Sequence, residues 1–328
     1  MKLLIVVHHH FDLWNVPAWF PERLQADFPQ IEVAHRTDYE GAEDYLRDSE
    51  VIFAFSLSLE QFRLAQKLRW IHAPTAAVHQ LLFPELVKSD VVLTNAHEVH
   101  GPVVAEHVMA LVFALAKKIP QATRLQQKHV WGQDEIWNDG PRPREVAGAT
   151  LGLIGLGSIG RTVARMASAL GMRVLAVREH PEKEKPEGVA EVYSPAQIND
   201  LLSQSDYVVV AAPLTEETRG VINAERLNAM RRDAYLINVG RGPQVDETAL
   251  AEALRNHGIA GAALDVFEQE PLPAESPLWE IETLLITPHT AGLTEKLWQR
   301  HYALFSENLR RYLAREPLPF VVDKQKGY

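Results

Sequence analysis

Three segments late in the chain place an imidazole, a carboxylate and a guanidinium beside short apolar runs. Arg241, Glu270 and His289 stand, in turn, in the segments INVGRGPQVDETAL (237–250), GAALDVFEQEPLP (261–273) and TPHTAGLT (287–294). A carbonyl that accepts a hydride must also accept a proton, which histidine can give near neutral pH. A neighbouring carboxylate stabilises the protonated imidazole, and a guanidinium can bind a substrate carboxylate and polarise the carbonyl. We therefore predict a hydride-transfer site with these three catalytic residues.

A glycine-rich turn predicts a dinucleotide site in the same half of the chain. It runs from Gly155 to Gly160, after the apolar run LGLI and before an alanine-rich helix. Gly155 permits a tight turn, Gly157 lets a pyrophosphate approach the backbone, and Gly160 lets helix and strand pack closely. The helix N-terminus adds unpaired N–H groups, so we expect Ser158 and Ile159 to contact the cofactor with the glycines. The alternative is a turn that binds no ligand.

The residue after the next predicted strand favours one form of the cofactor. An NAD site usually has an acidic residue there, which accepts a hydrogen bond from the ribose; this chain has Arg178. A guanidinium suits a 2′-phosphate, so we predict that NADP(H) is preferred, with NAD(H) as the alternative. Two observations leave that alternative open: Glu179 is adjacent and can take the ribose contact, and Arg178 can be a solvated residue.

The elements that must position these residues form an α/β fold. After Ala149, apolar runs alternate with helical patterns, and the six predicted strands match a doubly wound sheet: Thr150–Ile154, Arg173–Val177, Tyr207–Ala211, Ala234–Asn238, Gly261–Val266 and Leu284–Thr287. Residues 1–98 indicate a smaller parallel sheet covered on both faces. Its predicted strands are Leu3–Val7, Val51–Phe55, Trp70–His72 and Val91–Thr94. We therefore predict two doubly wound parallel-sheet domains.

Two longer helices are predicted outside these alternating units. Residues 103–119 are apolar on nearly all sides, so the helix is buried all round or covered by a partner subunit on one side. Residues 295–315 have an amphipathic pattern.

Composition excludes several classes of protein. With 33 basic and 43 acidic residues among 328, the net charge of −10 argues against nucleic-acid binding. The chain has no cysteine, which rules out disulfides, thiolate metal sites and a cysteine nucleophile. The apolar run Leu3–Val7 is too short for a signal peptide, and no run is long enough to span a membrane. We expect a cytoplasmic protein with no membrane partner.

The chain resembles the D-isomer-specific 2-hydroxyacid dehydrogenases over nearly its whole length. The resemblance includes the three segments above and VVAEHVMALVFAL, LGLIGLGSIGRTVA, APLTEETRGVIN and VVDKQKGY. It implies that Arg241 binds and polarises a 2-oxo acid, that His289 is the general acid in reduction and the base in oxidation, and that Glu270 raises the pKa of His289. It also implies that Asp265 meets the nicotinamide. The other cofactor-cleft residues that it implies are Pro213, Thr218, Val239, Gly240 and Gly292.

The resemblance also implies an organisation of domains. Residues 1–98 and 291–328 would form a flavodoxin-like substrate domain, and residues 99–290 a Rossmann cofactor domain. The helix at 103–119 would lie in a homodimer interface.

The N-terminal half departs from the family pattern in the loop that holds the substrate carboxylate. The loop reads Thr75-Ala76-Ala77-Val78-His79, with Ala77 where glycine is common and His79 where aspartate is common. The amides of Ala76, Ala77 and Val78 can still bind the carboxylate if Ala77 adopts the required backbone angles. Glu98 likewise stands where the family often has glycine.

Aromatic and histidine residues suggest further features of the substrate site. His8–His10 cannot all point the same way in an extended segment, so we expect no metal site there. With Phe11, Trp14 and His79 they are candidates to shape the pocket for the substrate side chain. Trp131 and Trp137 lie in a segment that can reach a partner's cleft.

We predict an oxidoreductase that reduces a 2-oxo acid to a D-2-hydroxy acid. Formate oxidation on the same fold is an alternative, but those enzymes have glutamine where Glu270 stands. A non-enzymatic, NAD(P)-sensing protein similar to transcriptional corepressors is a second alternative.

Overall fold

The computed structural model describes residues 1–327, which form two compact units. One unit contains residues 1–100 and the chain from Leu293 onward, and the other contains Gly101–Gly292. These boundaries lie two residues after the predicted ones. Both sheets are parallel and doubly wound, so the predicted fold class is confirmed. Within residues 1–327 no helix is both long and apolar enough to cross a membrane; the cytoplasmic location stays a prediction.

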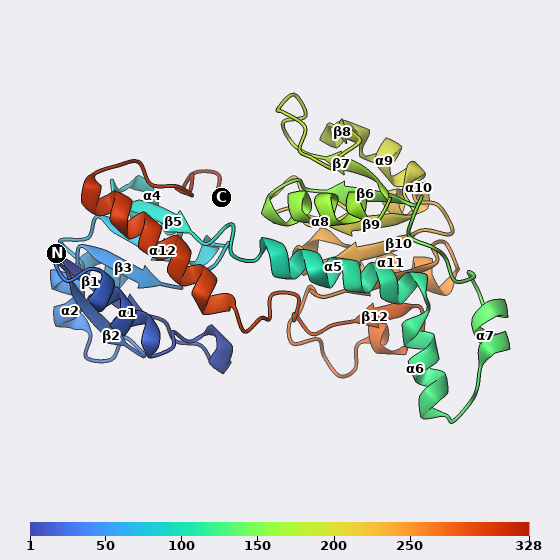
Figure 1. The fold of residues 1–328 in the computed structure, drawn as a ribbon, viewed down its shortest axis with the longest axis horizontal. Coiled ribbons are helices and arrows are strands. Elements are labelled where there is room, and N and C mark those ends of the chain that lie inside the picture. The colour runs from blue at the N-terminus through green and yellow to red at the C-terminus, as the bar shows by residue number, and fades with distance from the viewer. Residues whose placement is uncertain (328) are drawn as a thin grey trace. The chain divides into compact units, whose positions relative to one another are not determined.

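The first unit is built on a five-stranded sheet with the order β2-β1-β3-β4-β5 (Figure 1). Its strands are β1 (Lys2–Val6), β2 (Glu32–Arg36), β3 (Val51–Ala54), β4 (Trp70–Ala73) and β5 (Val92–Asn95). Its helices are α1 (Trp19–Asp27), α2 (Glu43–Asp48), α3 (Leu59–Leu64), α4 (Pro84–Lys88) and α12 (Leu297–Ala314), with short 3₁₀ turns at Asp12–Trp14 and His79–Leu81. Side chains alternate between the two faces: Phe53 packs with α1 and α12, and Ile52 with α2 to α4.

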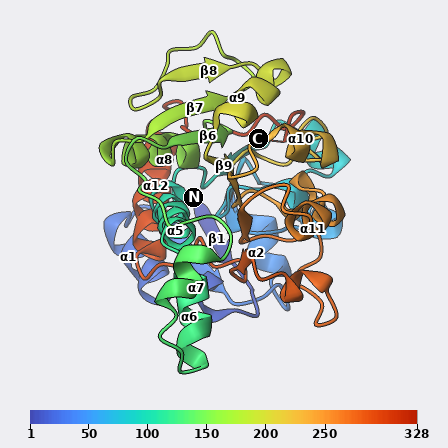
Figure 2. The ribbon, with the colours of Figure 1, turned by 90° about the vertical axis from the view of Figure 1, so that its right-hand side faces the viewer.

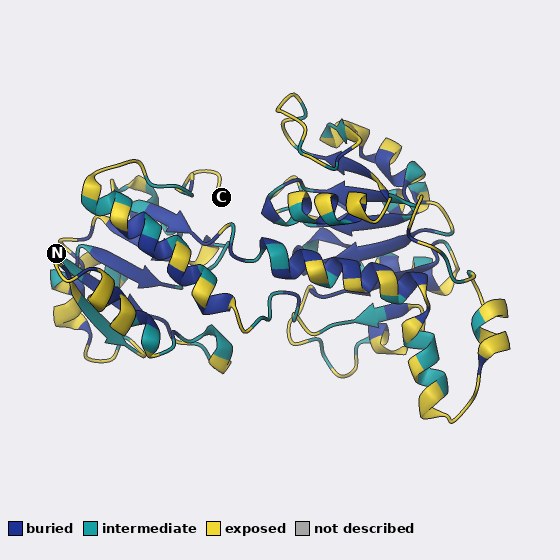
Figure 3. Cartoon of the chain, in the orientation of Figure 1, coloured by how far each residue is buried: buried dark blue, intermediate teal, exposed yellow. Residues whose placement is uncertain are grey.

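The second unit is built on a seven-stranded sheet with the order β12-β11-β10-β9-β6-β7-β8. Its strands are β6 (Thr150–Ile154), β7 (Arg173–Val177), β8 (Glu191–Tyr193), β9 (Tyr207–Val210), β10 (Tyr235–Asn238), β11 (Gly261–Leu264) and β12 (Leu284–Ile286). Its helices are α5 (Gly101–Ala116), α6 (Ile119–Gln127), α7 (Gln133–Asn138), α8 (Ser158–Ala169), α9 (Ile198–Gln204), α10 (Ala224–Ala229) and α11 (Glu247–Arg255). Further 3₁₀ turns span Pro195–Gln197, Gly242–Gln244 and Pro277–Glu280. The pair α5 and α8 covers one face and α9 to α11 the other, so the strands are mostly buried (Figure 3).

The predicted helix at 103–119 corresponds to α5, which ends three residues earlier, at Ala116, and is followed by a second helix, α6. Proline has no N–H, so Pro120 cannot donate to the carbonyl of Ala116, four residues earlier. The amide of Arg144 donates to that carbonyl instead, over 2.9 Å. Lys118 turns the chain with a left-handed φ of 53°, and α6 begins at the next residue. The helices α6 and α7 extend away from the seven-stranded sheet (Figure 1, Figure 2), and the side-chain amide of Gln121 donates to the carbonyl of Glu135.

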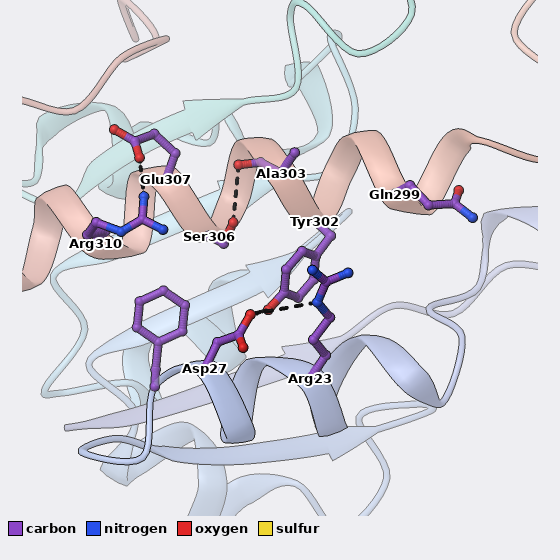
Figure 4. A pocket seen from close by; sticks show the side chains of 9 residues that line it. Arg23, Asp27, Gln299, Tyr302, Ala303, Ser306, Glu307 and Arg310 are labelled. Atoms are coloured by element: carbon purple, nitrogen blue, oxygen red, sulfur yellow. Dashed lines mark hydrogen bonds and ion pairs between the residues drawn. The ribbon is translucent and has the colours of Figure 1, made fainter.

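A surface pocket of about 550 Å³ lies between α1 and α12 (Figure 4). The phenol of Tyr302 donates to Asp27 over 2.5 Å, and the guanidinium of Arg23 lies over the Tyr302 ring. Arg310 pairs with Glu307, and both also line the pocket. Because these charged side chains already pair with one another, we assign the pocket no function.

Two histidines are wholly buried in the first unit. His72 on β4 and His301 on α12 are both 0% exposed. Burial lowers the pKa of His72 to about 3. Burial first, and then the nearby His100 and His72, lower the pKa of His301 well below its usual value. Neither ring nitrogen of His301 has a hydrogen-bond partner among the described residues, so nothing there compensates a charge on this ring.

We expect acid to destabilise the protein through His72 and His301. Above about pH 6.5 both are neutral in the folded and the unfolded chain, so they leave the free energy of unfolding unchanged. Below that pH only the unfolded chain binds the protons. Each of the two histidines then lowers the free energy of unfolding by about 1.4 kcal/mol for every unit by which the pH falls. Urea unfolding at several pH values, followed by tryptophan fluorescence, measures this slope. His301→Leu should flatten it, whereas His8→Leu at an exposed position should not; equal slopes would contradict the assignment.

Candidate active site

Three neighbouring strands carry the predicted catalytic residues to one edge of the seven-stranded sheet. Arg241 follows β10, Glu270 lies in the loop after β11, and His289 follows β12. These strands are adjacent and parallel, so their carboxyl ends lie at the same edge. Nδ1 of His289 is 2.6 Å from Oε2 of Glu270, and Arg241 lies within electrostatic reach of Glu270. The structure thus brings together the three residues that the sequence singled out.

The electrostatics of this group keep the carboxylate ionised. Burial by itself would raise the pKa of Glu270, but hydrogen bonds from His289 and the Phe267 amide, with the charges of His289 and Arg241, lower it below its usual value. An ionised carboxylate only accepts hydrogen bonds, so Nδ1–H of His289 donates to Glu270, and Nε2 is left for a reactant. Burial lowers the pKa of Arg241 and Glu270 raises it; the guanidinium remains charged.

Two buried amide side chains fix the backbone around Arg241. Asn238 accepts from the amide of Gly240 over 3.0 Å and donates to the carbonyl of Arg241 over 3.1 Å. Gln244 accepts from the amide of Arg241 over 2.7 Å. Both amide side chains are 0% exposed. Neither residue is among those predicted from the sequence, although a polar residue that ends the apolar run YLIN is a usable signal for Asn238.

The loop that carries His289 is held by Asp265. His289 has a left-handed φ of 52°, which is uncommon for a residue other than glycine. The buried carboxylate of Asp265 accepts from the Thr287 hydroxyl over 2.6 Å and from the amides of Thr290 and Ala291 over 2.8 and 3.0 Å. The sequence does not indicate this role. The contact between Asp265 and the nicotinamide stays a prediction.

The glycine turn has the geometry that a dinucleotide needs. Gly155 has a φ of 102°, and a Cβ there would lie 2.7 Å from the backbone of Ala212. A Cβ on Gly160 would lie 2.2 Å from the carbonyl oxygen of Gly155, so helix and strand pack closely only with glycine. Gly157 is the N-cap of α8, whose first turn begins with Ser158 and Ile159. These residues fit a pyrophosphate at the helix N-terminus.

Arg178 lies directly after β7, held by its own loop. Its guanidinium donates to the carbonyls of Lys183 and Glu184, and its Nε has no partner among the described residues. Glu179 is exposed. These contacts hold the guanidinium against its own loop, and they do not decide between the two cofactors.

The remaining residues of the expected cofactor cleft lie after β9, β10 and β12. The hydroxyl of Thr218 donates to the carbonyl of Pro213 over 2.6 Å. Val239 is buried, and a Cβ on Gly240 would lie 2.2 Å from Oε1 of Gln244. Gly292 is the last residue of the second unit.

The expected carboxylate loop follows β4 in the first unit. Ala77 has no left-handed φ, so alanine costs no strain where the family often has glycine. The loop is held by two hydrogen bonds: the Asn95 side chain donates to the carbonyl of Ala76, and the Ala96 amide donates to the carbonyl of Thr75. No hydrogen-bond acceptor for the amides of Ala76 and Ala77 occurs among residues 1–327.

The histidine run after β1 forms an aromatic cluster. The rings of His9 and His10 stack at 4.3 Å, and His9 lies edge-on to Trp14 and to Phe55 at 6.4 Å. Nδ1 of His9 accepts from the amide of Phe11 over 3.0 Å. In the described part of the chain no three histidine or acidic side chains are arranged to hold a metal ion.

The second unit matches a known family of enzymes. The family described as "D-isomer specific 2-hydroxyacid dehydrogenase, NAD binding domain" covers residues 109–291. The chain belongs to this family. This 2-hydroxyacid dehydrogenase is 35% identical to the glyoxylate reductase of Thermofilum pendens over 85% of its own length and 83% of the relative's. It is 31% identical to the D-3-phosphoglycerate dehydrogenase of Methanocaldococcus jannaschii, over 90% of its own length and 55% of the relative's.

Solved structures resemble this dehydrogenase over almost the whole chain. An NADPH-dependent glyoxylate/hydroxypyruvate reductase from Sinorhizobium meliloti, in complex with NADP and sulfate, has a TM-score of 0.83 at 28% identity and 100% coverage of both chains. A D-isomer specific 2-hydroxyacid dehydrogenase from Xanthobacter autotrophicus, in complex with NADPH, has a TM-score of 0.82 at 32% identity and 99% coverage of both chains. The protein is thus an NAD(P)-dependent 2-hydroxyacid dehydrogenase, and the family predicted from the sequence is confirmed.

Proposed function

We propose that this dehydrogenase reduces a 2-oxo acid to a D-2-hydroxy acid and prefers NADPH. The observation that carries the proposal is the 2.6 Å contact between Nδ1 of His289 and Oε2 of Glu270, beside the charged side chain of Arg241. This group can give a proton to a carbonyl oxygen and hold the carboxylate next to that carbonyl.

Each of the three side chains has one role in the proposed reaction. The nicotinamide, when bound, supplies a hydride to the carbonyl carbon of the substrate. Nε2–H of protonated His289 gives its proton to the carbonyl oxygen, and the charge of Glu270 stabilises the protonated ring before this step. The guanidinium of Arg241 binds the substrate carboxylate and polarises the carbonyl. In oxidation His289 takes the proton back.

The amides of Ala76, Ala77 and Val78 are proposed to bind the substrate carboxylate as well. Glyoxylate, hydroxypyruvate, pyruvate and bulkier oxo acids remain candidates. Glyoxylate is the first acid to test, because the relatives named above include a glyoxylate reductase and a glyoxylate/hydroxypyruvate reductase.

A panel of 2-oxo acids, each assayed with NADPH and with NADH, tests the proposal. We expect oxidation of the reduced cofactor with at least one acid, and a D-configured product by chiral chromatography. Cofactor binding with no turnover of any acid would favour the alternative of a cofactor-sensing protein. Turnover of formate alone would favour the formate-type alternative, against which Glu270 argues.

Arg178→Ala should lower kcat/KM for NADPH about 10- to 100-fold and leave that for NADH nearly unchanged. The reason is that a charge-assisted contact with the 2′-phosphate contributes about 1.5–3 kcal/mol. Two solved relatives hold NADP or NADPH, which supports this preference. Arg255→Ala, at an exposed position on α11, is the control. A wild-type enzyme with a clear preference for NADH would refute the assignment.

We further propose a homodimer formed through α5 and the segment that follows it. The exposed apolar side chains there are Phe113, Ile119, Val130, Trp131 and Trp137, and Trp131 is 91% exposed. So much exposed apolar surface on adjoining elements is typical of a subunit interface. Light scattering should give the mass of a dimer for the wild type and of a monomer for Phe113→Glu/Trp131→Glu. Trp279→Glu, at another exposed tryptophan, should stay dimeric; a monomeric wild type would contradict the proposal.

A further inference from the structure

The position of His289 depends on interactions behind it. Its backbone is left-handed, a conformation that residues with a side chain seldom adopt and that neighbouring contacts help to hold. Its amide donates to the carbonyl of Asp265 over 2.9 Å. The carboxylate of the same Asp265 accepts from the next two amides, those of Thr290 and Ala291. One buried residue therefore imposes the shape of the whole loop.

A second histidine reaches this buried carboxylate from α5. Nε2 of His107 lies 3.1 Å from Oγ1 of Thr287 and 3.6 Å from Oδ1 of Asp265. The Thr287 hydroxyl lies between them, 2.6 Å from the same Oδ1. His107 is half-buried, with 20% of its side chain exposed. The chain of contacts from α5 to the His289 loop lies within the second unit.

The direction of these hydrogen bonds follows from the number of protons. A hydroxyl has one proton, and Thr287 gives it to Asp265, because an ionised carboxylate only accepts. Towards His107 the hydroxyl oxygen can then only accept, so Nε2 of His107 must carry a proton. Burial lowers the pKa of His107 and Asp265 raises it by a smaller amount, so the ring is neutral near pH 7 with its proton on Nε2.

We propose that His107 is a positioning residue of this active site. Its Nε2–H donates to Thr287, which orients the hydroxyl toward Asp265. Asp265 in turn holds the loop that keeps His289 against Glu270. His107 touches no reacting atom in this account. The expected effect of His107 on turnover rests on the proposed function, but its expected effect on the position of the His289 loop does not.

His107→Leu and His107→Gln separate this role from simple packing. Leucine fills the space without a donor, whereas the glutamine amide can reach about as far as Nε2 and donate. With a 2-oxo acid as substrate, we expect His107→Leu to lower kcat about 10- to 100-fold, because a small displacement of a catalytic group has effects of this size. The substrate KM should change by less than about threefold, since in this account His107 acts on the position of His289 and not on substrate binding. His107→Gln should keep most of the activity. Equal activity of the two variants would overturn the proposal.

Thr287→Val removes the hydroxyl that links His107 to Asp265, with nearly the same side-chain volume. It should lower kcat as His107→Leu does, and the double variant should be no worse than either single variant, because both changes break one connected path. Additive losses would show that His107 acts elsewhere.

Crystal structures of His107→Leu and His107→Gln give a readout that needs no turnover. We expect the contact between Nδ1 of His289 and Glu270 to be lost in the leucine variant and kept in the glutamine variant. An unchanged contact in the leucine variant would overturn the proposal. If these structures behave as expected but no 2-oxo acid is reduced, the proposed function fails and the positioning role stands.

Discussion

His289→Ala should lower kcat for the reduction of a 2-oxo acid by about 10²–10⁴-fold, the range that general acid catalysis contributes. The side chain is the proton donor in the proposed reaction, and its Nδ1 is already engaged by Glu270 at 2.6 Å. Cofactor affinity should not change, because the glycine turn that fits the pyrophosphate lies after β6, at another strand end. Steady-state kinetics and fluorescence titration with NADPH measure the two quantities.

The backbone of His289 calls for a second variant as control. A left-handed φ disfavours alanine and tolerates asparagine, so a loss in the alanine variant alone can reflect a disturbed loop. His289→Asn suits the backbone but cannot give a proton near neutral pH, and it should be as inactive as the alanine variant. Substantial turnover by His289→Asn would remove His289 from the role of acid.

The grouping of Arg241, Glu270 and His289 was predictable because each of them follows a predicted strand. In a parallel sheet the residues that follow neighbouring strands lie at one edge, whatever the details of the loops. Their contact distances depend on the lengths and turns of those loops, which the residue pattern does not encode. The roles of Asp265 and His107 could not be predicted for the same reason. Asp265 binds backbone amides and the Thr287 hydroxyl, and His107 binds the same hydroxyl, and no pattern of residue types marks such contacts.

The strands that the sequence missed lie at sheet edges. Among residues 1–327, the strand β2 (EVAHR) pairs only with β1, and β8 (EVY) pairs only with β7. An edge strand is partly exposed, so it lacks the continuous apolar run that marked the central strands. The end of α5 was missed for a different reason. The apolar pattern continues to Ile119, whereas the helix ends at Ala116, whose carbonyl cannot accept from Pro120 because proline has no N–H.

Arg241→Ala should lower kcat/KM for a 2-oxo acid by about 10²–10⁴-fold, while the cofactor Kd stays the same. A guanidinium that binds a carboxylate and a carbonyl makes at least two charge-assisted hydrogen bonds, each contributing about 1.5–3 kcal/mol. The buried side chains of Asn238 and Gln244 hold the backbone of Arg241 before substrate binds. Binding therefore loses little free energy to the ordering of this residue.

Arg241→Lys distinguishes charge from geometry at this position. An ammonium keeps the charge but presents a point donor in place of a planar fork. We expect Arg241→Lys to recover about tenfold of the loss, an increment of about 1.4 kcal/mol, and to stay well below the wild type. Full activity in the lysine variant would mean that charge alone matters. A loss of less than tenfold in the alanine variant would mean that the substrate carboxylate is bound by other groups, with the amides of Ala76 and Ala77 the first to examine.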